Sequence, residues 1–411
     1  MCIKKMIMLI SLVSLCVLSA CDKKENKESV TTATGTEQKE TQKEQKEISK
    51  PSASTGMQHY DYESKLSETE DGYYFYMVSQ HIYYVDKKTM EATPLCFNLD
   101  CQHLFDESCQ AFVRNVRNLQ LYKGKLYVDI TTEKQDGENS YNYVNLYRMD
   151  LDGSNREKVM ELFTNEGLSD EESSRSLSLS FNWVIAGDNV YVCGSQVIND
   201  KEGEDYIDVY SLKNGKKIKR VYEEKISSED DNYYMSSYYD EENQFLYFKK
   251  YSLGYGNQEH FFRVSVKNHT CKIMWEERPI ADYMLYQDEW YYKMEDWLYH
   301  YNQKTKEPEE YIHLDGINYY ANIITDDQYI YVDNNQAQNH STEEKPIKKE
   351  DLYITIYNNK KEAVDTLKIP LKTYVIYNGT DKMLMDTGDK LYYFDKNAIG
   401  TGQLELKEIN K

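Results

Sequence analysis

Short segments in which apolar and polar residues alternate follow one another from about Tyr60 to the end of the chain. Alternation over four to eight residues is typical of half-buried β-strands, and Asp, Asn, Gly and Lys separate these segments as turn residues do. No long stretch carries the apolar period of a helix. The pattern therefore predicts an all-β domain over residues 60–411.

The alternating segments recur as one unit: a strand, a polar turn, an aromatic strand and a further hairpin. Seven copies lie at residues 71–89, 119–159, 183–222, 238–275, 283–305, 322–369 and 374–409. A repeat of about 50 residues has the length of a four-stranded propeller blade. We predict a single β-propeller of seven blades, each of about four antiparallel strands. Six or eight blades, a pair of β-sandwiches and an open solenoid are the alternatives.

The first residues follow a different pattern. Lys4 and Lys5 precede an apolar run over residues 6–18, which is shorter than the ~20 residues that cross a bilayer. This arrangement predicts an export signal rather than a membrane-spanning helix. The run ends in Leu18-Ser19-Ala20-Cys21, which resembles the lipobox of bacterial lipoproteins. The resemblance implies that residues 1–20 are removed and that a diacylglyceryl group on Cys21 holds the protein on the outer face of the cytoplasmic membrane. An ordinary secretory signal is the alternative.

Lys, Glu, Gln, Ser and Thr dominate residues 22–58, and aromatic residues are absent from this range. Such a composition favours a disordered linker, and a coil of this length spans on the order of 35 Å. We therefore expect a signal peptide over 1–20, a lipidated cysteine and linker over 21–59, and the propeller over 60–411.

Two strings resemble known families. NLYRMDLDGSN (145–155) is similar to the hairpin repeated in TolB-like and YWTD-type propellers and in related lipoprotein domains of unknown function in Gram-positive bacteria. PLCFNLDCQH (94–103), with Cys109, resembles a stretch of lipoproteins from gut Firmicutes. The resemblance implies a propeller fold and a surface location, and it implies no established activity.

The whole chain has a formal net charge of −21, and the predicted domain carries −23 of it, because the linker is neutral and the leader carries +2. An acidic surface repels nucleic acid and anionic lipid head groups, so we expect no nucleic-acid partner. It would suit cationic ligands or metal ions, or simply keep an exported protein soluble.

Cys96, Cys101, His103 and Cys109 lie together between the first and second repeats. Three thiols and an imidazole are donors that a tetrahedral zinc site uses. A disulfide within the cluster is the favoured interpretation, because oxidation is permitted outside the membrane. Zinc and reduced structural thiols are the alternatives. Cys193 and Cys271 lie in apolar segments and are expected to be buried.

The remaining motifs indicate structure rather than chemistry. Asp150 and Asp152 lack the further ligands of a calcium loop, so a hairpin turn is predicted. No GxSxG, HExxH, SxxK or P-loop motif is present. Four histidines have no obvious partner in the sequence: His260, His269, His300 and His313.

Tyrosine is the dominant aromatic residue, with 40 Tyr against 11 Phe. Adjacent tyrosines suit strands, in which we expect one ring to pack between sheets while its neighbour faces outward. The pairs are Tyr73-Tyr74, Tyr83-Tyr84, Tyr233-Tyr234, Tyr238-Tyr239, Tyr291-Tyr292 and Tyr392-Tyr393. Some loop aromatics, such as Tyr255 or Trp297, would instead line a binding rim.

The leading functional hypothesis is a membrane-tethered propeller that binds a glycan, peptide or protein ligand at the cell surface without catalysing a reaction. A polysaccharide hydrolase or lyase acting at the propeller axis and an envelope assembly scaffold are the alternatives. No cofactor is required by the leading hypothesis, apart from the zinc alternative at the thiols.

Overall fold

The computed structural model describes residues 66–410, with gaps at 167–180, 228–231, 253–259, 276–281, 315–321 and 335–351 and shorter gaps of one to three residues. The chain separates into two compact units, Met1–Ile48 and Ser49–Lys411, and every described residue belongs to the second. Cys21 and the predicted leader and linker lie outside the described residues. Within the described part, no helix has the length and apolar character to span a bilayer.

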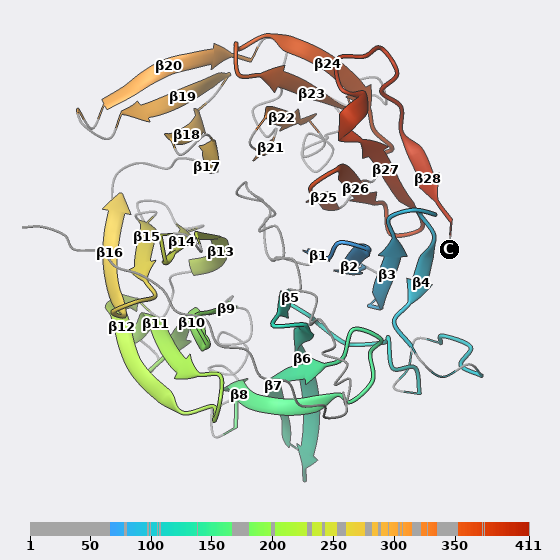
Figure 1. The fold of residues 1–411 in the computed structure, drawn as a ribbon. Helices are drawn as coiled ribbons and strands as arrows, with labels where there is room; N and C mark the ends of the chain where they lie inside the picture. The colour runs from blue at the N-terminus through green and yellow to red at the C-terminus, as the bar shows by residue number, and fades with distance from the viewer. Residues whose placement is uncertain are drawn as a thin grey trace, which may run out of the picture. The chain divides into compact units, whose positions relative to one another are not determined.

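Seven four-stranded antiparallel sheets make up the described domain and follow one another around a ring (Figure 1). The first three sheets, blades 1 to 3, consist of β1 (Leu66–Glu68), β2 (Gly72–Tyr76), β3 (Ile82–Asp86) and β4 (Ala92–Pro94); β5 (Leu119–Tyr122), β6 (Lys125–Asp136), β7 (Asn139–Met149) and β8 (Glu157–Thr164); and β9 (Asn182–Ala186), β10 (Asn189–Val197), β11 (Glu202–Ser211) and β12 (Lys217–Ser227).

Blades 4 to 7 continue the same order, so the predicted seven-bladed propeller is confirmed. They consist of β13 (Asn232–Asp240), β14 (Phe245–Ser252), β15 (His260–Ser265) and β16 (Thr270–Trp275); β17 (Asp282–Tyr286), β18 (Glu289–Met294), β19 (Trp297–Asn302) and β20 (Glu307–His313); β21 (Asn322–Thr325), β22 (Tyr329–Asp333), β23 (Tyr353–Asn358) and β24 (Ala363–Lys368); and β25 (Val375–Asn378), β26 (Lys382–Asp386), β27 (Leu391–Asp395) and β28 (Lys407–Ile409). A 3₁₀ turn, η3 (Lys396–Ala398), follows β27.

The central strands of the blades are covered on both faces. All five residues of β2 are buried, including both members of the Tyr73-Tyr74 pair, and Tyr291 and Tyr292 on β18 are also buried. The expectation that one ring of each pair faces outward is therefore wrong for these pairs. Alternation predicts a sheet with one solvated face, whereas in a propeller each blade is packed between two neighbours.

Polar side chains join the innermost strands of neighbouring blades. The Ser67 hydroxyl on β1 donates to the carbonyl of Leu119 on β5 at 3.1 Å. The Gln120 amide on β5 donates to the carbonyl of Ile185 on β9 at 2.9 Å and accepts from its N–H at 2.7 Å. Because short inner strands expose backbone groups at the blade edge, these side chains satisfy donors and acceptors that the sheets leave open.

Blade 1 and blade 7 meet without exchanging a strand, since each is built from four consecutive strands. Their shared core includes Phe75 and Tyr377, whose ring centroids lie 5.6 Å apart. Where β4 begins and β28 ends, the N–H of Ala92 donates to the carbonyl of Asn410 at 2.8 Å. We call the contact between β1–β4 and β25–β28 the closure junction.

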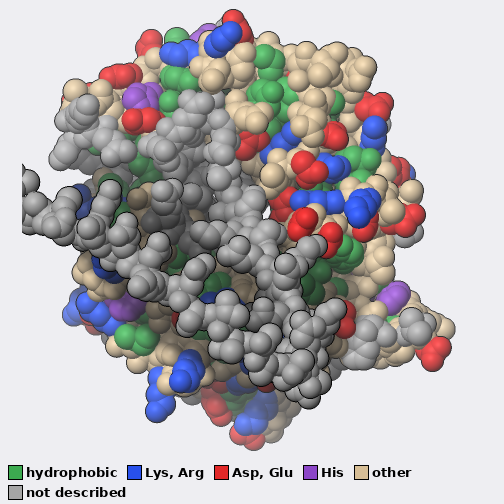
Figure 2. Space-filling view, viewed as in Figure 1, with side chains coloured by type: hydrophobic (Ala, Val, Ile, Leu, Met, Phe, Trp, Pro, Cys, Tyr) green, Lys and Arg blue, Asp and Glu red, His purple; other side chains and the backbone are tan. Residues whose placement is uncertain are grey.

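Acidic and basic side chains are interspersed on the visible surface over these two blades (Figure 2).

Candidate functional site

The predicted cysteine and histidine cluster lies in the connection between blades 1 and 2, residues 95–118. In Figure 1 this connection runs along the outer edge of the ring beside β4. One ligand atom from each of Cys96, Cys101, His103 and Cys109 lies within 4.8 Å of all the others. We call these four residues the thiol cluster. The sequence analysis grouped them correctly, and the fold brings their donor atoms to one point.

Backbone amides are directed at the sulfur of Cys96. The N–H groups of Asn98 and Gln110 donate to it. Burial raises the pKa of the Cys96 thiol, but these two amides and the neighbouring thiols of Cys101 and Cys109 outweigh it, so the pKa is lower than usual. Hydrogen bonds to a charged form stabilise that form. The surroundings of Cys96 therefore suit a thiolate.

The other two sulfurs also accept amide hydrogen bonds. The N–H groups of Ala111 and Phe112 donate to Cys109, and the N–H of His103 donates to Cys101 Sγ at 3.4 Å. Burial nevertheless raises the pKa of the Cys109 thiol to about 11, with a further contribution from the nearby thiol of Cys101. All three sulfurs thus face N–H donors. The neighbouring thiols favour ionisation of Cys96, whereas the thiol of Cys101 disfavours ionisation of Cys109.

The imidazole of His103 is turned into the cluster by an unusual backbone conformation. His103 has a φ of 52°, in the left-handed region, which costs a non-glycine residue about 1–3 kcal/mol. Its Nδ1 lies 3.6 Å from Cys109 Sγ. The next residue is also held, because the buried His81 contacts the Leu104 carbonyl through Nε2 at 3.3 Å. The surrounding contacts hold the loop in this conformation.

No disulfide joins the five cysteines that the structure describes, all of which are free thiols. The disulfide favoured from sequence is therefore not formed within the thiol cluster in this structure. Cys193 is fully buried, as predicted, and Cys271 is half-buried. Burial raises the pKa of the Cys271 thiol to about 12 and also raises that of Cys193. These two residues are inert core cysteines.

Arg156, just before β8, interacts with the thiol cluster from a distant part of the sequence. Its guanidinium donates to the Gln110 carbonyl. Burial lowers its pKa, whereas the Tyr147 hydroxyl and the thiols of Cys109 and Cys96 act in the opposite direction. Over the described residues, no carboxylate forms an ion pair with Arg156. Sequence reasoning missed it because nothing in the local sequence marks a contact with a loop 46 residues away.

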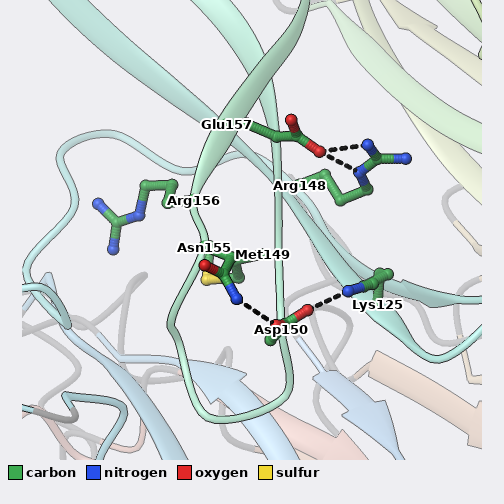
Figure 3. A pocket seen from close by; sticks show the side chains of 7 residues that line it. All are labelled: Lys125, Arg148, Met149, Asp150, Asn155, Arg156 and Glu157. Atoms are coloured by element: carbon green, nitrogen blue, oxygen red, sulfur yellow. Dashed lines mark hydrogen bonds and ion pairs between the residues drawn. The ribbon is translucent and has the colours of Figure 1, made fainter.

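A cavity of about 450 Å³ borders Arg156 beside the turn between β7 and β8 (Figure 3). Asp150 in this cavity pairs with Lys125 and accepts from Asn155 at 2.7 Å, and Glu157 pairs with Arg148. Figure 3 shows the Arg156 side chain pointing away from these pairs. The acids are thus neutralised by their own partners.

The predicted hairpin turn at Asp150 and Asp152 is confirmed. The N–H of Gly153 donates to the Asp150 carbonyl at 2.9 Å, and Asp152 accepts from the N–H of Ser154 at 2.9 Å. Gly153 has a φ of +84°, and a Cβ there would lie 2.7 Å from the Leu95 carbonyl oxygen. Glycine therefore lets this hairpin approach the residue that precedes Cys96.

A second cavity, also about 450 Å³, lies between the turns of blades 6 and 7. Its wall includes the Tyr329 ring, and its polar lining has carboxylate, amide, hydroxyl and ammonium groups. The lining residues are Asp326, Gln328, Tyr329, Asn378, Gly379, Thr380, Asp381, Lys396, Asn397 and Ile399. We call it the blade 6–7 pocket. A volume of this size accommodates a small ligand.

A buried ion pair fixes the floor of the blade 6–7 pocket. The Lys396 ammonium lies 2.8 Å from Asp326 and also donates to the Asn378 side chain. Burial lowers the pKa of Lys396, while the charge of Asp326 acts against that shift. Burial likewise raises the pKa of Asp326, but Lys396 and the Tyr331 hydroxyl outweigh it and hold it below the usual value. The ammonium of Lys396 and the carboxylate of Asp326 thus lie within ion-pair distance on the floor of the pocket.

Two other polar groups are buried between blades. Asp129 on β6 is fully buried and accepts from the Trp183 indole on β9 at 2.9 Å, and burial raises its pKa. Lys250 on β14 lies 2.6 Å from Asp205 and 3.0 Å from Glu224. These contacts cross from blade 2 to 3 and from blade 3 to 4. Asp129 also lies 3.6 Å from the Arg117 guanidinium, so Asp129 and Lys250 each have a partner of opposite charge, as buried charges usually require.

The scattered histidines find partners in the fold. His269 Nδ1 lies 2.9 Å from the Tyr191 hydroxyl, and His313 Nε2 lies 3.1 Å from Asp296. His300 lies between two glutamates, and His260 lies 3.7 Å from Glu224. Trp297 packs against His313 and lines neither cavity, and Tyr255 lies outside the described residues.

No protein-family model matches the chain, and no curated protein matches it. Solved structures similar to it include PorZ, an essential bacterial surface component of the type-IX secretion system of Porphyromonas gingivalis, at 10% identity and a TM-score of 0.46 over 86% of this chain and 39% of PorZ. A proposed 6-phosphogluconolactonase from Bacteroides uniformis has 12% identity and a TM-score of 0.47 over 87% of this chain and 97% of that protein.

Pyrococcus horikoshii acylaminoacyl peptidase has 12% identity and a TM-score of 0.41 over 79% of this chain and 48% of the peptidase. The chain thus spans less than half the length of PorZ and of the peptidase. These proteins differ in function, and the assignment of the fold rests on the seven sheets themselves.

Proposed function

We propose that the protein is a surface lipoprotein of the Gram-positive type, with a TolB-like or YWTD-like propeller that binds a small polyhydroxylated ligand, such as a glycan fragment, without catalysing a reaction. The observation that carries the binding role is the blade 6–7 pocket. The anchor is supported by the leader and by Cys21, and the linker would hold the propeller away from the membrane.

The chemistry of the blade 6–7 pocket favours hydroxyl groups. Carboxylates accept hydrogen bonds from hydroxyls, the Lys396 ammonium donates to them, and side-chain amides do both. The Tyr329 ring supplies an apolar surface for the carbon face of a sugar. Because Asp326 and Lys396 already neutralise one another, the pocket favours a neutral polar ligand over a strongly charged one.

Calorimetric titration of the full chain with monosaccharides and soluble cell-wall glycan fragments tests the binding role. We expect Gln328→Ala and Tyr329→Ala to weaken binding about tenfold or more, since each removes one pocket contact. Tyr301→Ala is the matched control, because Tyr301 is half-buried on β19 outside the pocket. Product formation from any fragment would instead establish the polysaccharide-acting enzyme, and no binding by the whole panel would overturn the proposal.

The anchor is tested by detergent phase partitioning of the protein expressed in a bacterial host. Wild-type protein should enter the detergent phase, and Cys21→Ala should remain in the aqueous phase or keep its leader, because the acylated thiol is lost. Cys16→Ala is the matched control within the same apolar run. Equal partitioning of both variants with wild type would contradict lipidation at Cys21.

A further inference from the structure

We propose that Cys96, Cys101, His103 and Cys109 bind one Zn²⁺ ion in a closed tetrahedral site whose role is to hold the connection between blades 1 and 2. This site is independent of the blade 6–7 pocket and of any ligand bound there.

The spacing of the donor atoms fits zinc. With Zn–S near 2.3 Å and Zn–N near 2.0–2.1 Å, a tetrahedral angle places sulfur and nitrogen about 3.6 Å apart and two sulfurs about 3.8 Å apart. His103 Nδ1 and Cys109 Sγ are 3.6 Å apart, and all four donor atoms lie within 4.8 Å of one another. Small side-chain adjustments therefore complete the site.

The number and kind of donors also favour a structural zinc ion. Three thiolates and one imidazole form one of the usual donor sets of structural zinc sites, and they leave no coordination position for water. A disulfide would use two of the three sulfurs and would leave the remaining thiol and the imidazole without a role. Soft sulfur donors also select against calcium and magnesium, which bind oxygen ligands.

The charges around the thiol cluster balance when zinc is present. Three thiolates and Zn²⁺ together carry −1, and the Arg156 guanidinium interacts electrostatically with Cys96 and Cys109. Five backbone N–H groups also face the sulfurs, two at Cys96, two at Cys109 and one at Cys101. Second-shell donors of this kind stabilise thiolate ligands and orient them.

The position of the cluster explains what the metal would do. The described residues of 95–118 form no named strand, yet Cys109, Ala111 and Phe112 are packed into the core between blades 1 and 2. Backbone hydrogen bonds attach the segment to blade 1 at its two sides, at Leu95 and around Ala111, and metal binding would add free energy that depends on the folded arrangement between them. The zinc ion would tie Cys96, at the start of the segment, to Cys109, where the chain enters the core.

Metal analysis of the full chain, purified in detergent without chelators, tests this proposal. We expect about one zinc per chain in wild type and less than about a tenth of that in Cys101→Ser, which loses one of four ligands. Cys271→Ser is the matched control and should keep its zinc, because Cys271 lies outside the cluster. Arg156→Met should weaken zinc affinity about 10-fold or more while leaving all four ligands in place.

Cobalt substitution keeps the test decisive where Cys101→Ser folds poorly. Wild-type protein refilled with Co²⁺ should show thiolate charge-transfer bands and the intense visible bands of a tetrahedral site. A disulfide between any two cluster cysteines in protein purified without reductant would overturn the proposal. Absence of metal from folded wild-type protein incubated with excess Zn²⁺, or a different metal at full occupancy, would also overturn it.

Discussion

Blade 1 is held on its two sides by different chemistry. On the side of blade 2, the continuous connection 95–118 brings three thiols and an imidazole together over a local stretch of sequence. On the side of blade 7, the closure junction relies on residues up to 312 positions apart, such as Thr380, whose N–H donates to Glu68 at 2.8 Å. The first side is local in sequence and the second is entirely non-local.

This difference shows that two contacts between neighbouring blades of one ring can be stabilised in different ways. At the closure junction the chain does not link the blades, so packing and buried hydrogen bonds must overcome the entropy of closing a loop that spans the whole domain. Between blades 1 and 2 the loop entropy is small, and only a few backbone hydrogen bonds, near Leu95 and Ala111, attach the described part of the connection to blade 1. A metal site is suited to the second problem and an apolar core to the first.

The largest expected effect comes from emptying the core of the closure junction. Phe75 is fully buried against Tyr377, so Phe75→Ala should lower the free energy of unfolding by about 3–5 kcal/mol, measured by urea denaturation. Phe75→Leu retains most of the apolar volume and should cost clearly less. A loss below about 1 kcal/mol for Phe75→Ala would show that the closure junction contributes little to stability.

Removal of zinc should destabilise the connection between blades 1 and 2. Treating the full chain with a strong chelator should lower the free energy of unfolding by about 2.7 kcal/mol, the linkage expected when free zinc exceeds its Kd about 100-fold. Limited proteolysis should show new cleavage within residues 95–118, while β25–β28 stay protected. Cleavage that begins at β25–β28 instead would contradict the separation of the two joints.

A smaller effect is expected from one hydrogen bond in the closure junction. The Tyr377 hydroxyl donates to the Tyr76 carbonyl at 2.9 Å. Tyr377→Phe retains the ring and should lower the free energy of unfolding by about 1 kcal/mol in urea denaturation. Tyr393→Phe, on a half-buried ring of the same blade, should change it less. Equal losses in the two variants would argue against a specific role for this bond.

The smallest effect concerns pH. Burial raises the pKa of Asp381, but Lys382, Tyr73 and Lys87 outweigh it, so its pKa lies below 3.8. A carboxyl with a depressed pKa contributes stability above pH 3.8 that is lost as the pH falls through the lower, folded value. Asp381→Asn should therefore be less stable than wild type at pH 7, and the difference should shrink near pH 3. A constant difference at both pH values would exclude this contribution.

The sequence predicts the fold well because blades are local units. Each of the seven repeats contains its own strands and turns, so alternation and turn residues are sufficient to place them. The same alternation fails at Tyr73 and Tyr74, both of which are buried. Periodicity indicates which residues share a face of a strand, but it cannot reveal that a neighbouring blade covers the second face.

The residues of the candidate sites that are close in sequence could be predicted, and those that are far apart in sequence could not. The thiol cluster could be grouped from sequence because its members lie within 14 residues. The contact of Arg156 with this cluster and the pairing of Lys396 with Asp326, 70 residues apart, depend on which blades become neighbours. Lysine and aspartate are also abundant on protein surfaces, so no local signal distinguishes these two buried residues from solvated ones.

The lack of an exchanged strand between blades 1 and 7 has a mechanical consequence. A pulling force applied to the chain at Leu66 acts directly on β1, which pairs only with β2 in its sheet. A strand shared between the first and last blades would resist such a force by shearing several backbone hydrogen bonds at once. Here three residue pairs between β1 and β2 and the side-chain contacts of the closure junction bear the load, so mechanical opening of the ring would begin at blade 1.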